Sequence, residues 1–130
     1  MVNRNKANKA KGDKYERDIL ARCLEFGFTQ ARRTRPGRME DMGDIHLTHD
    51  GRHILQTKDA ATPVWREWLT GLARQKYAAQ AATAALVVKR RGSGANPPIH
   101  LAVMHLDDYL ALLRLTEAYR ERAQIDGDVA

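Results

Sequence analysis

The spacing of apolar residues predicts a chain that alternates between helices and strands. Residues 13–26 have the spacing of a helix that ends at Gly27, because glycine readily adopts the left-handed conformation of helix ends. Apolar side chains from Val64 to Leu72 repeat this spacing, and the alanine-rich stretch after them extends the helix to about residue 82. The remaining elements are predicted as strands at 28–33, 44–48, 52–58, 85–89 and 99–104 and as a helix at 107–123. The order α-β-β-β-α-β-β-α predicts a mixed α/β or α+β domain.

A single carboxylate interrupts the apolar side of the first predicted helix. Projected at about 100° per residue, this side consists of Tyr15, Ile19, Leu20, Cys23 and Leu24. Glu16 falls in the middle of it. A carboxylate that faces a core is strongly unfavourable unless a cation, a metal or a set of donors pairs with it. Two interpretations follow: Glu16 forms a buried salt bridge, or it belongs to a functional site.

The segment HILQTKD, residues 53–59, begins as an apolar strand and ends with polar groups. Because side chains alternate along a strand, Gln56 and Lys58 share one face and Thr57 lies on the other. An amide and an ammonium side by side are unusual at the end of a strand that enters a core. They indicate that the strand ends at a site with chemistry of its own.

The loop before this strand determines which residues face Gln56 and Lys58. A two-residue loop would place Asp44 opposite Thr57. A three-residue loop at 49–51, with Gly51 left-handed in a bulge, would place Asp44 opposite Gln56. The sequence alone does not choose between these registers. We favour the second because it also gathers the apolar residues of strand 44–48 on the reverse face as a second apolar layer.

With that register, Glu16, Asp44, Gln56 and Lys58 converge on one place. Carboxylate and amide oxygens are hard ligands suited to Mg²⁺ or Mn²⁺. A lysine beside them would orient or deprotonate a water, or stabilise charge on a phosphate. The set therefore predicts metal-dependent hydrolysis of phosphodiester bonds.

The composition of the chain indicates which class of molecule such a site would bind. The 130-residue chain is long enough for one domain, and its 22 Lys and Arg against 16 Asp and Glu leave a formal charge of +6. This excess favours a polyanion, and nucleic acid over a membrane, because no amphipathic or apolar anchor accompanies it. An ordinary basic enzyme is the alternative.

The single cysteine and the polar N-terminal segment predict a soluble, cytoplasmic protein. Cys23 has no second cysteine with which to form a disulfide, and neither a signal peptide nor a membrane-length apolar run is present. Residues 1–12 carry four basic residues and no acid, which predicts a flexible basic arm ahead of a single domain at 13–130.

Three stretches of the chain resemble the PD-(D/E)xK nuclease superfamily and, within it, the archaeal-type Holliday-junction resolvases. They are KGDKYERDIL at 11–20, GDI at 43–45 and QTK at 56–58. The resemblance spans about residues 11–104 and implies a restriction-endonuclease-like core, α-β-β-β-α-β, with a central mixed sheet flanked by helices. Glu16 matches the helix-one glutamate of that family, Asp44 the motif aspartate and Lys58 the motif lysine.

The resemblance also implies an activity. It is a Mg²⁺-dependent endodeoxyribonuclease, with Mn²⁺ as a possible substitute, that cuts four-way or otherwise branched DNA in recombination and repair and works as a homodimer. Asp44, Gln56, Glu16 and the Thr57 carbonyl would hold the metal, and Lys58 would assist the attacking water. The alternatives are a restriction- or repair-type nuclease on duplex DNA and a DNA-binding module whose weakened motif no longer catalyses.

Two positions depart from the family pattern. Gly43 stands where a proline usually precedes the aspartate, and Gln56 stands where resolvases usually have a carboxylate. The Gln-x-Lys version is similar to that of the methyl-directed restriction endonucleases. It removes one negative charge from the metal site, which should weaken cation binding. Glu40 or Asp41, just before the motif, would be a substitute ligand.

Basic and aromatic residues outside the motif are candidates for DNA contacts. Basic side chains near the motif and in the later loop are predicted to bind phosphates, or else to form a solvated charged surface; they are Lys11, Arg32, Arg33, Arg35, Arg38, Lys89, Arg90 and Arg91. Trp65, Trp68 and Tyr77 would stack on unpaired bases, or, for Trp68 in particular, belong to the core or a dimer interface.

Overall fold

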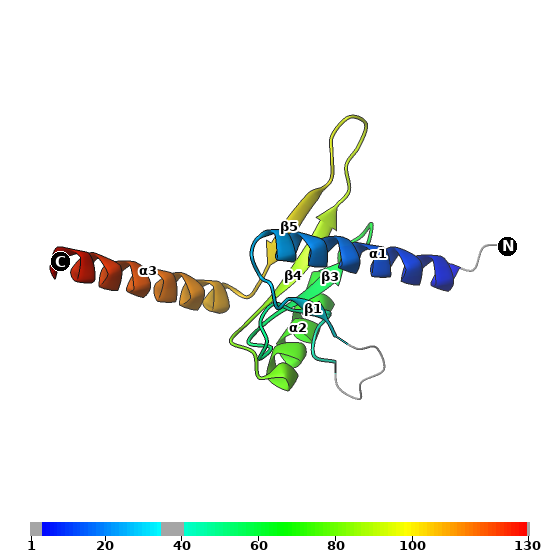
Figure 1. The fold of residues 1–130 in the computed structure, drawn as a ribbon. Coiled ribbons are helices and arrows are strands. Elements are labelled where there is room, and N and C mark those ends of the chain that lie inside the picture. Colours follow the sequence, from blue (N-terminus) through cyan, green and yellow to red (C-terminus); the bar gives the residue numbers. More distant parts are fainter. Residues whose placement is uncertain (1–3, 35–40, 130) are drawn as a thin grey trace.

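The computed structural model describes residues 4–34 and 41–129 of the chain. Its centre is a five-stranded mixed sheet with the strand order β1-β2-β3-β4-β5 (Figure 1). The strands are β1 (Arg32–Arg33), β2 (Ile45–His46), β3 (His53–Lys58), β4 (Thr83–Arg90) and β5 (Ile99–Val103), and the helices are α1 (Arg4–Glu25), α2 (Trp65–Ala79) and α3 (Leu106–Val129).

One parallel pair lies at the middle of the otherwise antiparallel sheet. β3 and β4 run parallel, whereas the β1–β2, β2–β3 and β4–β5 pairs are antiparallel. A parallel neighbour requires a crossover, and α2 supplies it. The crossover fixes α2 against the sheet, so the ends of β3 and β4 are held in place from one side.

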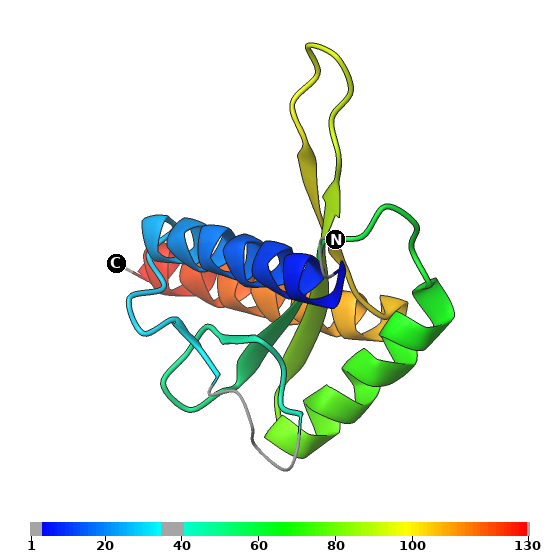
Figure 2. The same cartoon turned by 90° about the vertical axis from the view of Figure 1, so that its right-hand side faces the viewer.

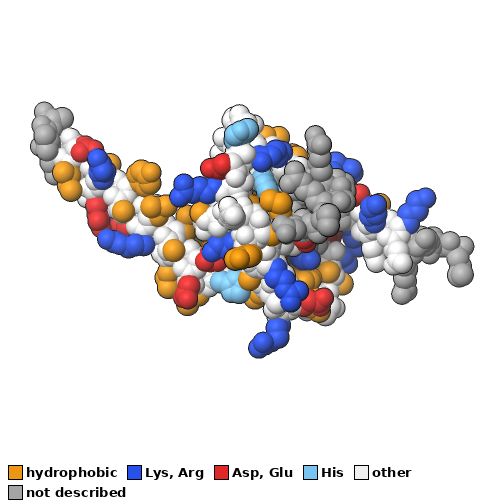
Figure 3. All heavy atoms as spheres, turned by 90° about the horizontal axis from the view of Figure 1, so that it is seen from below, with side chains coloured by type: hydrophobic (Ala, Val, Ile, Leu, Met, Phe, Trp, Pro, Cys, Tyr) orange, Lys and Arg blue, Asp and Glu red, His pale blue; other side chains and the backbone are white. Residues whose placement is uncertain are grey.

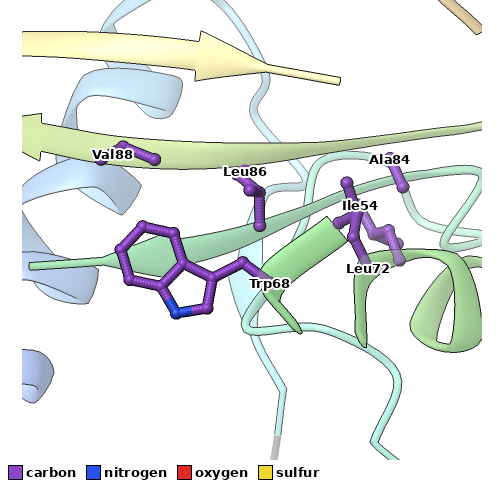
Figure 4. Packing of buried hydrophobic residues seen from close by; sticks show 6 residues of the cluster. All are labelled: Ile54, Trp68, Leu72, Ala84, Leu86 and Val88. Atoms are coloured by element: carbon purple, nitrogen blue, oxygen red, sulfur yellow. The ribbon is translucent and has the colours of Figure 1, made fainter. Parts of the chain in front are cut away.

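Two apolar clusters cover the two faces of the sheet. On the α2 face, Trp68 and Leu72 pack against Ile54, Leu86 and Val88 of β3 and β4 (Figure 4). On the other face, the α1 side chains of Tyr15 and Ile19 pack against Ile45 and Val87. Figure 2 shows the two helices on either side of the strands. The predicted second apolar layer behind Asp44 is confirmed, and so is the predicted apolar side of the first helix except for Leu24, which is exposed.

The last helix, α3, leaves this body after β5 and projects away from it (Figure 1). The described side chains from Tyr109 to Gly127 are all exposed. Near its start, Lys76 Nζ of α2 forms an ion pair of 2.8 Å with Asp108 Oδ1, and His105 Nε2 lies 3.1 Å from the Leu69 carbonyl oxygen. These contacts fix only the beginning of α3 against the body.

The structure confirms a mixed α+β domain and corrects several boundaries. α1 begins at Arg4, so residues 4–12, predicted as part of a flexible arm, are helical. This stretch has no proline, and its lysines and alanines have high helix propensity, which charge content alone does not reveal. The first two strands are short, and α3 continues to Val129, six residues beyond its predicted end. Within the described residues no helix combines the length and the apolar composition needed to cross a membrane.

Candidate active site

Asp44 lies immediately before β2, at the edge of β3. Its N–H donates to the Leu55 carbonyl oxygen at 2.9 Å, and its Oδ2 accepts bonds from the Thr57 N–H at 2.9 Å and the Thr57 hydroxyl at 3.0 Å. The N–H and C=O of one residue in an extended strand point to the same edge, so the Thr57 carbonyl also faces the Asp44 side. A carboxylate and a main-chain carbonyl are thereby brought to one edge of β3.

Gly43 makes this approach possible. Its φ of +90° is one that L side chains rarely adopt, and an added Cβ would lie 3.3 Å from the Leu55 carbonyl oxygen. Proline, with φ fixed near −65°, is excluded from this conformation. The glycine that replaces the usual proline of the resembled motif is therefore required by the local backbone of this chain.

The β2–β3 register is the one favoured from the sequence. Ile45 pairs with Leu55 and His46 with Ile54, and the same register places Asp44 across from Gln56. Gly51 has φ +70°, and a Cβ there would meet His46 Nδ1 at 2.8 Å. The predicted register and the left-handed Gly51 are confirmed, although the strands end earlier than predicted and residues 47–52 join them. The buried His46 ring adds a second reason for glycine.

Gln56 and Lys58 face the α2 side of the sheet, in a cavity of about 480 Å³. The Gln56 Oε1 atom is buried and has no hydrogen-bond partner among the described residues. Lys58 Nζ lies 5.6 Å from the centroid of the Trp68 ring, which forms part of the cavity wall. A buried acceptor without a donor is costly in a folded protein, so this oxygen is suited to an added cation or donor.

A second amide and a further acid line the same cavity. Gln75 Nε2 donates to Asp41 Oδ2 at 2.7 Å, while Asp41 Oδ1 accepts from the Gly43 N–H at 3.0 Å. Like Gln56, Gln75 has a buried Oε1 without a partner among the described residues. Asp41 was a candidate ligand from the sequence, but its pairing with Gln75 across 34 residues carried no sequence signal. Glu40, the other candidate ligand before the motif, lies outside the described residues.

Glu16 has a different environment from the one its predicted metal role requires. Its Oε1 accepts a bond of 2.8 Å from Arg33 Nε, and its side chain is 15% exposed. The structure therefore gives Glu16 the salt bridge that the sequence left open as its alternative. Arg33 also approaches Asp13 at 3.4 Å, so the guanidinium joins two acids of α1 to β1. Arg33 was predicted only as a phosphate contact, and no spacing rule links it to Glu16.

The carboxylates of Glu16 and Asp44 influence each other. Burial, the largest cause, raises the pKa of Glu16; the Arg33 hydrogen bond opposes the rise and the charge of Asp44 adds to it. Burial also raises the pKa of Asp44, against the two Thr57 hydrogen bonds, with the charge of Asp41 adding to the rise and that of Lys58 lowering it. Two desolvated acids at one end of a sheet form a region that attracts a cation.

The predicted DNA contacts divide into three groups. Arg32 donates to the carbonyl oxygens of Thr48 and His49 at 2.8 and 3.0 Å, and Arg91 pairs with Asp59 at 3.3 Å, so these two and Arg33 have internal partners. Lys11 and Arg90 are exposed, and Lys89 Nζ lies 5.7 Å from the centroid of the Tyr15 ring. Arg35 and Arg38 lie outside the described residues. Phosphate binding by these side chains stays a prediction.

Among the described residues, no three His, Cys, Asp or Glu side chains come together as a metal-binding group. The candidate oxygen ligands at the end of β3 belong to Asp44, the Thr57 main chain and the Gln56 amide, and two of these three residues are outside that set of residue types. The Asp44 carboxylate is bonded to Thr57, whereas the Gln56 side chain lines the cavity on the α2 side. The structure thus brings Asp44, Thr57, Gln56 and Lys58 to one end of β3 and leaves Glu16 paired with Arg33 on the α1 side.

The chain matches no family model, and no curated protein or solved structure is significantly similar to it. Its class, as far as fold and site define it, is a mixed α+β domain with a polar cluster at the end of a central strand.

Proposed function

We propose that this protein is a Mg²⁺-dependent endodeoxyribonuclease of the Holliday-junction resolvase type, which cuts phosphodiester bonds in branched DNA. One observation carries the proposal. The Asp44 carboxylate accepts two bonds from Thr57, the residue between Gln56 and Lys58 in β3, and the buried Gln56 Oε1 lacks a hydrogen-bond partner among the described residues. The order α-β-β-β-α-β of this domain supports a restriction-endonuclease-like core as part of the same proposal.

The donor set fits a hard divalent cation. Asp44, the Gln56 amide oxygen and the Thr57 carbonyl would hold Mg²⁺, because such oxygens are its preferred protein ligands. When bound, the ion would stabilise negative charge on the scissile phosphate and favour ionisation of a water. Glu16 would join this set only by giving up its bond to Arg33; in the present arrangement it adds negative potential beside Asp44.

Lys58 supplies the cationic group. It shares the Gln56 face of β3, and the Trp68 ring beneath it restricts where its ammonium lies. In this position Nζ would donate to a phosphate oxygen or to the attacking water, which stabilises charge that develops in the transition state. The formal charge of +6 would attract the DNA backbone to this end of the domain.

A homodimer belongs to the proposal, and α3 is the surface that would form it. The helix is apolar on two opposite sides. Leu112, Leu115 and Tyr119 line a cavity of about 550 Å³ against the body, and Leu106, Leu110 and Leu113 follow the other side. The exposed fractions of Leu106 and Leu110 are 66% and 51%. Exposed apolar side chains that line one side of a helix are typical of an interaction surface, so a covering partner for α3 is part of the proposal.

The charges of α3 favour a second copy of the same helix in the antiparallel direction. Asp107 and Asp108 begin the helix, whereas Arg120 and Arg122 follow its leucine-rich stretch. Within the same helix Arg120 pairs with Glu117 at 3.5 Å, and Glu121 pairs with Arg114 at 3.6 Å. An antiparallel pair centred on that stretch brings the acidic start of one copy to the basic segment of the other; a parallel pair brings like charges together. Figure 3 shows apolar and charged side chains side by side along the projecting helix.

A second candidate function is a DNA-binding module without catalysis. Gln56 replaces a charged ligand, and the pairing of Glu16 with Arg33 withdraws another acid from the site. Both features lower the negative charge available to a cation. Under this alternative the protein binds junctions tightly and in a salt-dependent way but yields no product with Mg²⁺ or Mn²⁺.

Cleavage of a labelled four-way junction in Mg²⁺ tests the two candidates. We expect product from the wild type, loss of cutting with binding retained in Lys58→Ala, and wild-type cutting in the control Lys14→Ala, whose lysine is exposed on α1. Gln56→Glu restores a carboxylate and should keep or raise activity at low Mg²⁺. Full activity in Lys58→Ala would exclude this site, equal cutting of junction and matched duplex would indicate a duplex nuclease, and binding without product would select the module.

A further inference from the structure

A second cavity lies on the far side of the tryptophan pair from Gln56. It measures about 360 Å³ and is formed by the segment after β3, the start of α2 and the ends of β4 and β5. Val88 and Leu101, which pair across β4 and β5, give it an apolar floor. Trp65 forms one wall, and Arg90, Arg91 and Ser93 form the rim. This volume is within the range of cavities that bind small molecules.

Trp65, which forms one wall of this cavity, is exposed and packs against a second ring. Trp65 is 41% exposed, whereas Trp68 is 9% exposed and belongs to the core. The two rings meet edge to face, with centroids 5.5 Å apart and an interplanar angle of 83°. Trp65 therefore rests on a buried ring, and its position costs little further ordering when a ligand binds. An apolar floor beside an indole suits a flat aromatic ring.

The rim adds positive charge to this aromatic site. Arg91 pairs with Asp59 at 3.3 Å, and the Asp59 side chain is only 3% exposed, so this guanidinium is held in place. Arg90 is exposed and shares the cavity with it. Two guanidiniums against one carboxylate leave a net positive rim. The ligand that matches an apolar aromatic floor with a cationic rim is an aromatic ring bearing an anion, as in a nucleotide.

The tryptophan pair connects this cavity to the candidate active site. Lys58 Nζ is 5.6 Å from the Trp68 ring centroid, and Trp68 contacts Trp65. A strand whose phosphate lies at Lys58 would have a neighbouring nucleotide near Trp65. A base within a duplex is stacked on its neighbours, so only an unpaired base is free to enter.

We propose that this cavity binds one unpaired nucleobase of the DNA strand, stacked on Trp65, with the adjoining phosphate on Arg90. The proposal rests on the DNA-directed function above and adds to it a preference for unpaired nucleotides beside the cutting site. It predicts that single-stranded or opened DNA binds better than a closed duplex of the same sequence.

Intrinsic fluorescence tests the proposal in the full-length protein with EDTA present, so that cleavage plays no part. The chain has two tryptophans, of which Trp65 is the more exposed, so a stacked base should quench mainly its emission. We expect quenching by a short single-stranded oligonucleotide and weaker quenching by the same strand annealed to its complement. Trp65→Ala should weaken binding of the single strand by at least about fivefold, as loss of one stacking partner does.

Variants separate stacking from a general effect on the surface. Trp65→Phe keeps an aromatic ring and should retain most of the affinity, whereas Arg90→Ala should weaken binding and reduce its dependence on salt. The control is Phe26→Ala, which removes a 76% exposed ring just after α1, away from this cavity, and should bind like the wild type. Circular dichroism checks that each variant is folded.

The results distinguish failure of this proposal from failure of the nuclease proposal. Quenching that depends on Trp65 in a protein that cuts no DNA supports the base site and rejects the nuclease. Equal affinity in Trp65→Ala and wild type, or equal quenching by single strand and duplex, overturns the base site even if junctions are cut.

Discussion

The helices α2 and α3 are both rich in large apolar side chains, but their surroundings are opposite. Both follow a strand and both carry large apolar side chains at helical spacing. Trp68 and Leu72 of α2 are buried at 9% and 1% exposure, whereas Leu110 of α3 is 51% exposed. The difference arises from topology. α2 must return the chain to β4, a parallel neighbour of β3, whereas α3 follows β5 and is not a crossover between described strands.

This contrast shows that apolar periodicity predicts a helix without predicting what covers it. The crossover helix receives its partner from its own chain. The described apolar side chains of α3 are exposed, and we propose that a second copy of the chain covers them. The candidate active site is formed by the packed crossover helix and its strand, because β3 and α2 hold Gln56, Lys58 and Trp68 around one cavity.

The largest expected effect compares equal truncations in the two helices. Leu72→Ala should lower the free energy of unfolding by about 2–5 kcal/mol, because it leaves a cavity in the packed α2 cluster. Leu110→Ala should cost no more than about 0.5 kcal/mol in dilute protein, where the side chain faces water. Urea denaturation followed by circular dichroism measures both. Similar losses in the two variants would mean that α3 is packed within the monomer.

The next effect concerns the association of α3. Leu113→Glu places a charge on its outer apolar side and should weaken dimer formation tenfold or more, about 1.4 kcal/mol, as seen by sedimentation equilibrium. Asp107→Arg should also weaken it, because it would face Arg120 and Arg122 of an antiparallel copy.

The matched control for this experiment is Tyr77→Glu, which adds the same charge at an exposed aromatic position of α2 and should leave association unchanged. A wild type that stays monomeric at every concentration would contradict the α3 interface. Association that Leu113→Glu does not weaken would place the interface elsewhere on the chain.

The smallest expected effect lies in the active site and depends on pH. The pKa of Asp44 is raised above its ordinary 3.8, mainly by burial, so the folded state binds this proton more tightly than the unfolded state. Wild-type stability should therefore fall as pH rises from below 3.8 through the folded-state pKa, and the penalty is fully present at neutral pH. Asp44→Asn should have a higher urea midpoint at pH 7 and a smaller advantage near pH 4, while abolishing cleavage.

Asp18→Asn is the control of opposite sign. The Lys14 hydrogen bond lowers the pKa of this exposed carboxyl, so its neutralisation should not stabilise the protein at pH 7. If Asp44→Asn were destabilising at pH 7 and unaffected by acid, the Thr57 bonds would outweigh the cost of burying the charge.

Much of the site was predictable because it depends on alternation along two short strands. Gln56 and Lys58 share a face because they are two residues apart, and left-handed Gly51 sets a register that places Asp44 across from Gln56. The partner of Glu16 was not predictable in this way. Arg33 reaches it through the path of the chain between α1 and β1, and local spacing contains no information on that path.

The extent of α1 is a second feature that the sequence did not predict. Residues 4–12 are basic and lack large apolar side chains, and that composition predicts a flexible segment, yet they continue the helix. The helix already formed over the packed residues around Tyr15 and Ile19 removes the cost of nucleation, so weakly favourable residues extend it. The composition of residues 4–12 shows that they lack large apolar side chains for a core. It does not show that the helix beside them can continue through them.

The sequence by itself determined the order of elements, the apolar faces of α1 and α2, the basic charge and the polar residues that share the end of β3. These follow from the spacing and chemistry of neighbouring residues. Only the tertiary structure decided that Arg33 pairs with Glu16, that Thr57 donates to Asp44, that the Gln56 oxygen has no donor among the described residues and that α3 projects from the body. Each of these features depends on groups that are not neighbours in the chain. Their positions are set by the crossover between β3 and β4 and by the helices that pack on the sheet.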